Sequence, residues 1–69
     1  MPIIKYIVEV TTNNNKAFSK VVYSFNDYEL AKKEYELEKE ELWSKDTVKL
    51  IKRVTGESDR TLESYTKED

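Results

Sequence analysis

The 69-residue chain contains no cysteine and no histidine. It therefore lacks disulfide bridges, the thiolate nucleophile, the usual ligands of transition metals, and the one side chain that titrates near neutral pH without a special environment. It also has a single glycine, whereas a P-loop or a dinucleotide-binding fingerprint needs at least two. We expect neither a cofactor nor a metal.

Carboxylates are the remaining candidates for catalysis. Glu34, Glu38 and Glu41 follow i, i+4, i+7 spacing and share one side of a predicted helix. A carboxylate pair that acts as acid and base needs a concave, partly desolvated setting. A surface helix on a chain of this size offers no such setting, so the sequence indicates a protein that is not an enzyme.

A chain of this length predicts one domain with a small core, about 3–5 kcal/mol of net stability. We assign the domain to residues 1–65 and a frayed tail to residues 66–69. Disulfides and metals are the common supports of small domains, and a chain without cysteine and histidine has little access to either. This favours a homo-oligomer, most simply a homodimer. The lack of cysteine favours the cytoplasm. Residues 1–10 alternate and are too short for a signal peptide or a membrane span.

Two strands are predicted before the helix. Residues 3–11 alternate with apolar side chains on both faces, which is typical of an interior strand. The asparagines at 13–15 then favour a hairpin turn. Residues 17–25 form the second strand, with Val21, Tyr23 and Phe25 on its more apolar face.

The period changes at residue 25, and a helix is predicted over the region 27–43. Asn26 is the expected N-cap, with Glu29 completing a capping box and Phe25 and Leu30 forming a hydrophobic staple. The helical spacing of Tyr28, Ala31, Tyr35 and Leu42 predicts the stripe that faces the sheet. We expect Trp43 to close the end of the core, whereas Leu37 has no evident partner.

Two further strands are predicted at residues 47–55 and 60–65, separated by a turn at Gly56. A right-handed crossover from the second strand to the third places the third strand beside the first. The sequence therefore predicts an α+β fold, β-β-α-β(-β), with an antiparallel sheet of order 2-1-3-4 and one helix on one face. The expected core consists of the helix stripe and ten strand residues: Ile4, Tyr6, Val8, Val10, Val21, Tyr23, Phe25, Val48, Leu50 and Val54.

Nothing in the chain is expected to cover the other face of the sheet. An open face that mixes apolar and basic residues more often marks an interface than a bare surface, although strands also favour β-branched residues for their own sake. The candidate partner-binding residues of this face are Ile3, Ile7, Phe18, Val22 and Ile51, bordered by Lys5, Lys20, Lys49 and Arg53.

Two other interpretations compete with a protein-binding site on the open face. The same face, with Phe18 among basic residues, resembles a stacking platform for single-stranded nucleic acid, although a pI of about 5.2 argues against it. The second is the predicted helix region, where seven acids stand against three lysines and could dock on a basic partner.

Two segments, YSFNDYELAKKEY at 23–35 and VKLIKRVTGE at 48–57, resemble small uncharacterised proteins carried by phages and prophages of Gram-positive bacteria. They cover about a third of the chain. The resemblance implies a non-enzymatic accessory protein that binds and modulates a host or viral protein, and it transfers no functional residue. We therefore expect a small protein-binding module, with single-stranded nucleic-acid binding and a homo-oligomeric structural role as the alternatives.

Overall fold

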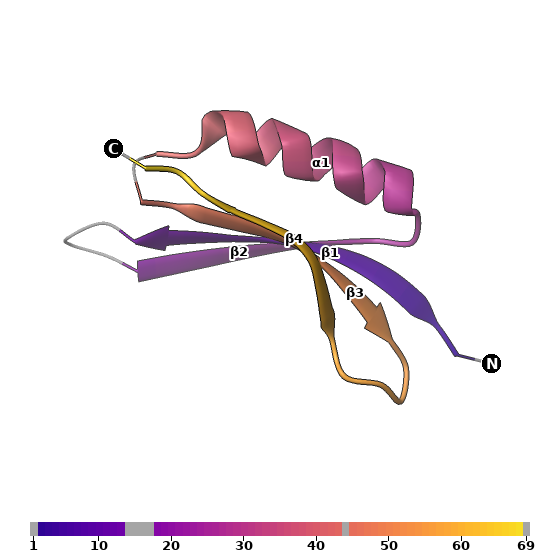
Figure 1. Cartoon of the computed structure of the whole chain (residues 1–69). Coiled ribbons are helices and arrows are strands. Elements are labelled where there is room, and N and C mark those ends of the chain that lie inside the picture. The colour runs from indigo at the N-terminus through magenta and orange to yellow at the C-terminus, as the bar shows by residue number, and fades with distance from the viewer. Residues whose placement is uncertain (1, 14–17, 44, 69) are drawn as a thin grey trace.

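The computed structural model describes residues 2–13, 18–43 and 45–68; of residues 13, 18 and 19 it describes the backbone alone. Four strands and one helix follow one another along the chain (Figure 1). They are β1 (Ile4–Asn13), β2 (Phe18–Phe25), α1 (Tyr28–Glu41), β3 (Thr47–Val54) and β4 (Arg60–Thr66). The expected asparagine turn falls at the end of β1, and its residues 14 and 15 lie outside the described part.

The strands form one antiparallel sheet in the order β2-β1-β3-β4, which confirms the predicted α+β fold and its topology. β1 is an interior strand, as its two-sided apolar pattern indicated. Val8 shows the arrangement at the centre: it lies opposite Tyr23 of β2 on one side and Leu50 of β3 on the other.

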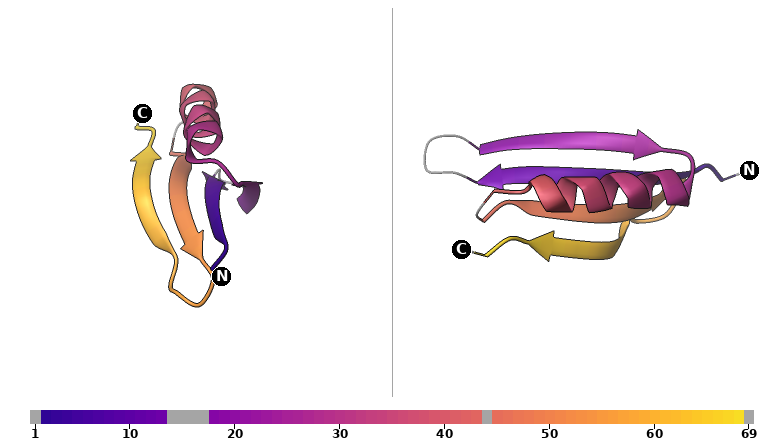
Figure 2. Two further views of the ribbon diagram at one scale, coloured as in Figure 1. Left: turned by 90° about the vertical axis from the view of Figure 1, so that its right-hand side faces the viewer. Right: turned by 90° about the horizontal axis from the view of Figure 1, so that it is seen from above.

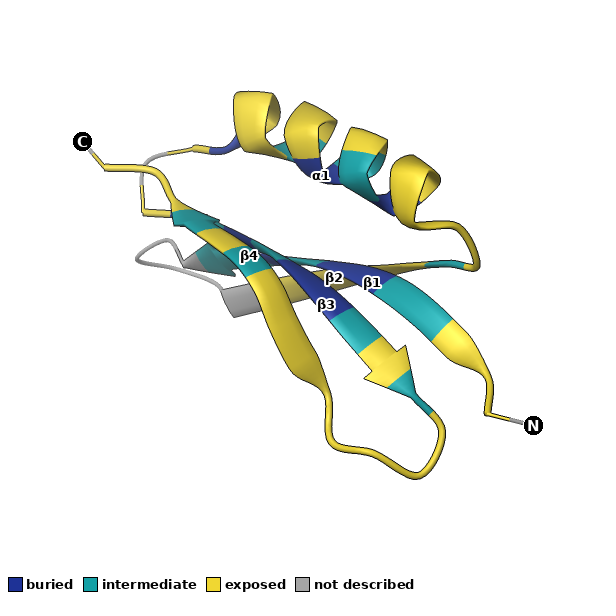
Figure 3. Ribbon diagram, turned by 45° about the vertical axis from the view of Figure 1, so that its right-hand side comes forward, coloured by how far each residue is buried: buried dark blue, intermediate teal, exposed yellow. Residues whose placement is uncertain are grey.

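The core lies between α1 and the two central strands. Viewed from above, the helix runs along β1 and β3, and β2 is left to one side (Figure 2). Burial follows the same line, with the least exposed residues under the helix (Figure 3). The buried core residues are Val8, Val10, Ala31, Tyr35, Leu42, Val48 and Leu50, with Tyr6, Phe25 and Tyr65 packed against them.

The helix covers less of the sheet than the sequence suggested. Val21 and Tyr23 of β2 and Ile4 of β1, all assigned to the core, are exposed, and Val54 is half-buried. A helix with its side chains is about 10 Å wide, whereas the strands of a sheet lie about 4.8 Å apart. One helix therefore covers about two strands, and here these are β1 and β3.

The helix begins one residue later than predicted. Its N-cap is Asp27, whose Oδ1 accepts a hydrogen bond from the amide of Glu29 at 2.9 Å. The expected Asn26 cap, the capping box and the Phe25–Leu30 staple are therefore wrong, and Leu30 is exposed. Aspartate caps as well as asparagine does and also places a negative charge at the positive end of the helix dipole.

The end of the helix also differs from the expectation. α1 ends at Glu41, and the extended backbone of Leu42 turns the chain away while the Leu42 side chain fills the end of the core. Trp43 follows this turn and is 80% exposed. The prediction that Trp43 closes the core is wrong because Leu42 already occupies that place.

Backbone hydrogen bonds tie the loop after Trp43 to the C-terminal strand. The amide of Asp46 donates to the carbonyl of Trp43 at 3.0 Å, and Oδ2 of the buried Asp46 accepts from the Trp43 amide at 3.2 Å. Lys67 donates to the carbonyl of Asp46 and accepts from the amide of Lys45. The loop is therefore joined to the residue that follows β4, and β4 itself ends at Thr66, one residue beyond the predicted strand.

The position of the cap gives a direct test. Asp27→Ala should lower the free energy of unfolding by about 1 kcal/mol, the usual cost of losing a capping side chain. Asn26→Ala should change it by less than about 0.5 kcal/mol, as expected at an exposed site without a structural role. Urea denaturation of both variants measures the difference. If Asn26→Ala lowered the free energy of unfolding more than Asp27→Ala does, the cap would be Asn26, as the sequence first suggested.

Candidate protein-binding surfaces

The open face of the sheet has a buried apolar centre. Ile7 and Ile51 lie opposite each other on β1 and β3, and they are only 3% and 8% exposed. The expectation that both would be uncovered is therefore wrong. The residues that bracket them on the same face are long, and the stems of such side chains cover apolar surface; they are Lys5, Arg53, Glu9 and Lys49.

Of the five expected apolar residues, the two that are exposed in the described part of the chain stand apart. Ile3 precedes β1, whereas Val22 lies opposite Glu9 in the middle of that strand. Ile3 and Glu9 are six residues apart along the extended chain, which corresponds to about 20 Å at ~3.3 Å per residue. The side chain of Phe18, the fifth expected apolar residue, lies outside the described part of the chain. The expected continuous apolar patch is thus divided.

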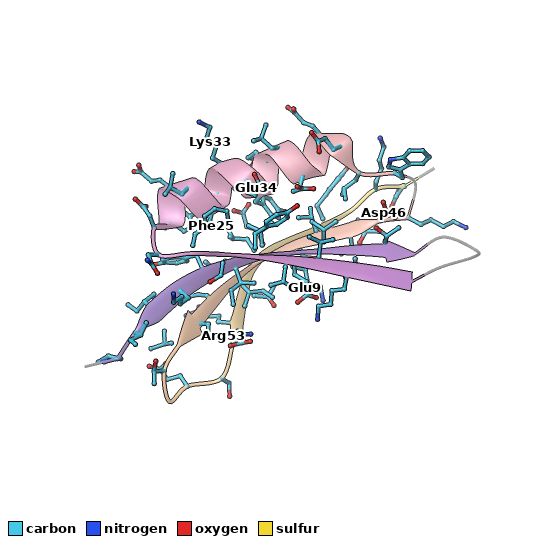
Figure 4. The ribbon with its side chains drawn as sticks, turned by 180° about the vertical axis from the view of Figure 1, so that it is seen from behind. Glu9, Phe25, Lys33, Glu34, Asp46 and Arg53 are labelled. Atoms are coloured by element: carbon cyan, nitrogen blue, oxygen red, sulfur yellow. The ribbon has the colours of Figure 1, made fainter. Side chains whose placement is uncertain are left out.

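Acidic neighbours neutralise two of the four expected basic residues. Lys20 Nζ lies 3.3 Å from Glu9 Oε2. Arg53 makes a two-pronged pair with Asp59, with Nε–Oδ1 and Nη2–Oδ2 distances of 3.0 and 2.9 Å. This pair lowers the pKa of Asp59 and raises that of Arg53. Glu9 and Arg53 both lie on the side of the sheet away from the helix (Figure 4).

A second surface lies between β2 and α1. The acidic flank of the helix consists of Glu34, Glu38 and Glu41, and Glu34 projects from the side of α1 above β2 (Figure 4). The Tyr23 hydroxyl of β2 interacts with the Glu38 carboxylate, so β2 and the flank are close together. The charge of Glu38 is the main cause of the raised pKa of Tyr23, followed by burial and by the charges of Glu34 and Glu41.

The acidic flank is crowded with like charge. Partial burial is the main cause of the raised pKa of Glu38, and the charge of Glu34 and a hydrogen bond to Glu34 raise it further. Glu41 adds to the effect, while the hydrogen bond from Tyr23 opposes it. The flank thus carries a negative field that the chain itself leaves partly uncompensated.

Lysines occupy the opposite flank of the helix, towards β4. Lys32 forms ion pairs with Glu36, at 3.1 Å, and with Glu63 of β4. The hydrogen bond to Glu63 is the main cause of the raised pKa of Lys32. Lys39 Nζ lies 4.8 Å from the centre of the Tyr65 ring. These contacts join α1 to β4. The flank towards β4 thus presents lysines, whereas the flank towards β2 presents glutamates.

Exposed apolar side chains accompany the acidic flank. On the helix side of β2, Val21 is 45% exposed and Tyr23 is exposed as well. On the helix, Leu30 and Leu37 are exposed and stand within one turn of Glu34. We call Val21, Tyr23, Leu37 and the acidic flank the β2–α1 surface.

Across residues 2–13, 18–43 and 45–68, no three carboxylates gather in a geometry that could hold a metal ion. The helix found in that part of the chain is neither long enough nor apolar enough to span a membrane.

No protein-family model, curated protein or solved structure matches the chain. The resemblance to phage and prophage proteins therefore stays a prediction.

The sequence placed Val21 and Tyr23 in the core because they share the more apolar face of their strand with Phe25, and so missed them as surface residues. A signal was nevertheless present. The apolar stripe of the helix is narrow, whereas the predicted sheet has four strands. A comparison of the two widths indicates that one edge strand stays uncovered.

The raised pKa of Glu38 predicts a pH dependence of stability. A carboxyl with a raised pKa binds its proton more tightly in the folded state than in the unfolded state. Such a carboxyl destabilises the folded state as the pH rises above its ordinary pKa of 4.5. Glu38→Gln should therefore be more stable than the natural protein at pH 7, and this gain should vanish below about pH 4. The matched control is Glu40→Gln, on the outer side of α1. Thermal unfolding across this pH range measures both, and an equal gain for the control would contradict the assignment.

Proposed function

We propose that the chain is a non-enzymatic protein-binding module that docks its partner on the β2–α1 surface. The observation that carries the proposal is the uncovered edge strand, where Val21 and Tyr23 lie exposed beside the acidic flank. Exposed apolar residues bordered by charge are typical of interaction sites, and tyrosine is enriched in them.

The arrangement suits a protein better than a nucleic acid. Phosphates would be repelled by the acidic flank, and on the open face Lys20 and Arg53 are already paired with carboxylates. A protein partner can supply both apolar contact and basic charge. Single-stranded nucleic-acid binding through the open face remains the alternative that the test below must distinguish.

Three expectations from the sequence accompany this proposal. A role as a phage or prophage accessory protein that modulates a host or viral protein fits a binding module without catalysis. Cytoplasmic location and self-association stay predictions. For self-association, the burial of Ile7 and Ile51 removes the centre of the surface on which a homodimer was expected.

Affinity capture with charge-reversal variants tests the proposal. A tagged protein should retain a protein partner from its native host, and Glu34→Lys should reduce the yield several-fold by reversing a charge in the acidic flank. Glu40→Lys, which makes the same charge change on the outer side of the helix, should retain the partner. Circular dichroism checks that both variants fold.

Two results would contradict the proposal. One is equal loss of the partner in both variants, which would indicate that net charge alone matters. The other is the absence of a protein partner together with binding of a single-stranded oligonucleotide that weakens steeply with added salt. That second result would favour nucleic-acid binding through the open face.

A further inference from the structure

We infer that the partner docks through an extended basic segment, which adds to the outer edge of β2 as a fifth strand. Its basic side chains then face the acidic flank of α1. This inference rests on the proposed function and specifies its geometry.

The edge of β2 supports strand addition. β2 pairs with β1 on one side only, so alternate amides and carbonyls on its other side are free of strand partners within the described chain. Natural edges are often blocked by a proline, a bulge or inward charges. β2 has no proline, its register with β1 is continuous, and Val21, Val22 and Tyr23 are exposed in a row. The other edge strand, β4, pairs with β3 irregularly, since the register between them shifts between Leu50 and Ile51 of β3.

The geometry of a fifth strand determines which charge its side chains should carry. Such a strand would lie about 4.8 Å beyond β2, and its alternate residues would project to the helix side. The Tyr23 hydroxyl, which projects from β2 on that side, already reaches Glu38. A longer lysine or arginine from the next strand can therefore approach Glu34, Glu38 or Glu41. The intervening residues would lie beside Val22 on the other face, where β-branched side chains pack well.

A second copy of the chain fits this edge poorly. Two β2 strands joined by a two-fold axis would carry both helices on the same face, with their acidic flanks towards each other. The helix side of β2 offers no base to offset this, because its one lysine, Lys20, points to the opposite face and pairs with Glu9. Like charges facing each other across an interface oppose association. The occupant that complements the edge is therefore a basic segment of a different protein.

A synthetic peptide provides the test. A fluorescent nine-residue peptide that alternates lysine or arginine with valine should bind the full chain, as measured by fluorescence anisotropy, and binding should weaken as salt rises. The same peptide methylated on alternate backbone nitrogens keeps its charge but cannot pair with a strand, so it should not bind. A peptide with glutamate in place of the bases should not bind either.

Protein variants locate the site. Glu34→Lys should weaken binding of the basic peptide about fivefold or more, as expected for reversing one charge of an exposed pair. Glu40→Lys should leave the affinity within about twofold. In amide NMR spectra, the largest shifts on peptide addition should fall on residues 20–25.

The proposal is overturned if the methylated peptide binds as well as the parent peptide, or if the shifts map to the open face. It is also overturned if the free protein is already a dimer with the β2 amides protected, since a second copy would then hold the edge. Failure of every peptide, with partner capture that still depends on Glu34, would refute the added strand and leave the proposed function standing. Loss of both would refute the proposed function as well.

Discussion

One helix of 14 residues has to cover a sheet of four strands, and the rest of the structure follows from this mismatch of widths. Tyr35, Ala31 and Leu42 fix the helix over β1 and β3, where they bury Val8 and Leu50. β4 still contacts the helix, because Glu63 and Tyr65 reach up to its lysines. Among the described side chains of β2, Phe25 packs against the core and Tyr23 interacts with the acidic flank, whereas Val21 and Val22 stay exposed on opposite faces.

The distribution of charge gives this asymmetry a chemical meaning. Lys32 and Lys39 on the β4 side of the helix have partners within the chain. On the β2 side, partial burial raises the pKa of Glu38, and the charges of Glu34 and Glu41 raise it further. The same side carries exposed valines and an unpaired strand edge. In the proposed mode of binding, stability and binding use opposite flanks of one helix, and a basic partner would relieve the repulsion among the glutamates.

Much of the fold was accessible from the sequence, since alternation, helical period and crossover handedness together limit the topology to few choices. The helix cap and the end of the core were misplaced by one residue each, because Asn26 and Asp27 cap equally well and because Leu42 and Trp43 are both large and apolar. The site was harder to place. Periodicity correctly assigns Val21 to the helix face of the sheet and Ile7 to the open face. It does not indicate that the helix leaves Val21 exposed, nor that Ile7 is buried on the face without a helix.

Native-state hydrogen exchange tests the central claim, that β2 is an uncovered edge, most directly. Amides of residues 20–25 that point away from β1 should exchange with the solvent far faster than their inward neighbours, while the amides of Val8, Val10, Val48 and Leu50 should be the most protected. This alternation should hold for the free protein at low concentration. Uniform protection along β2 would contradict the account, because it would mean that something already covers the edge.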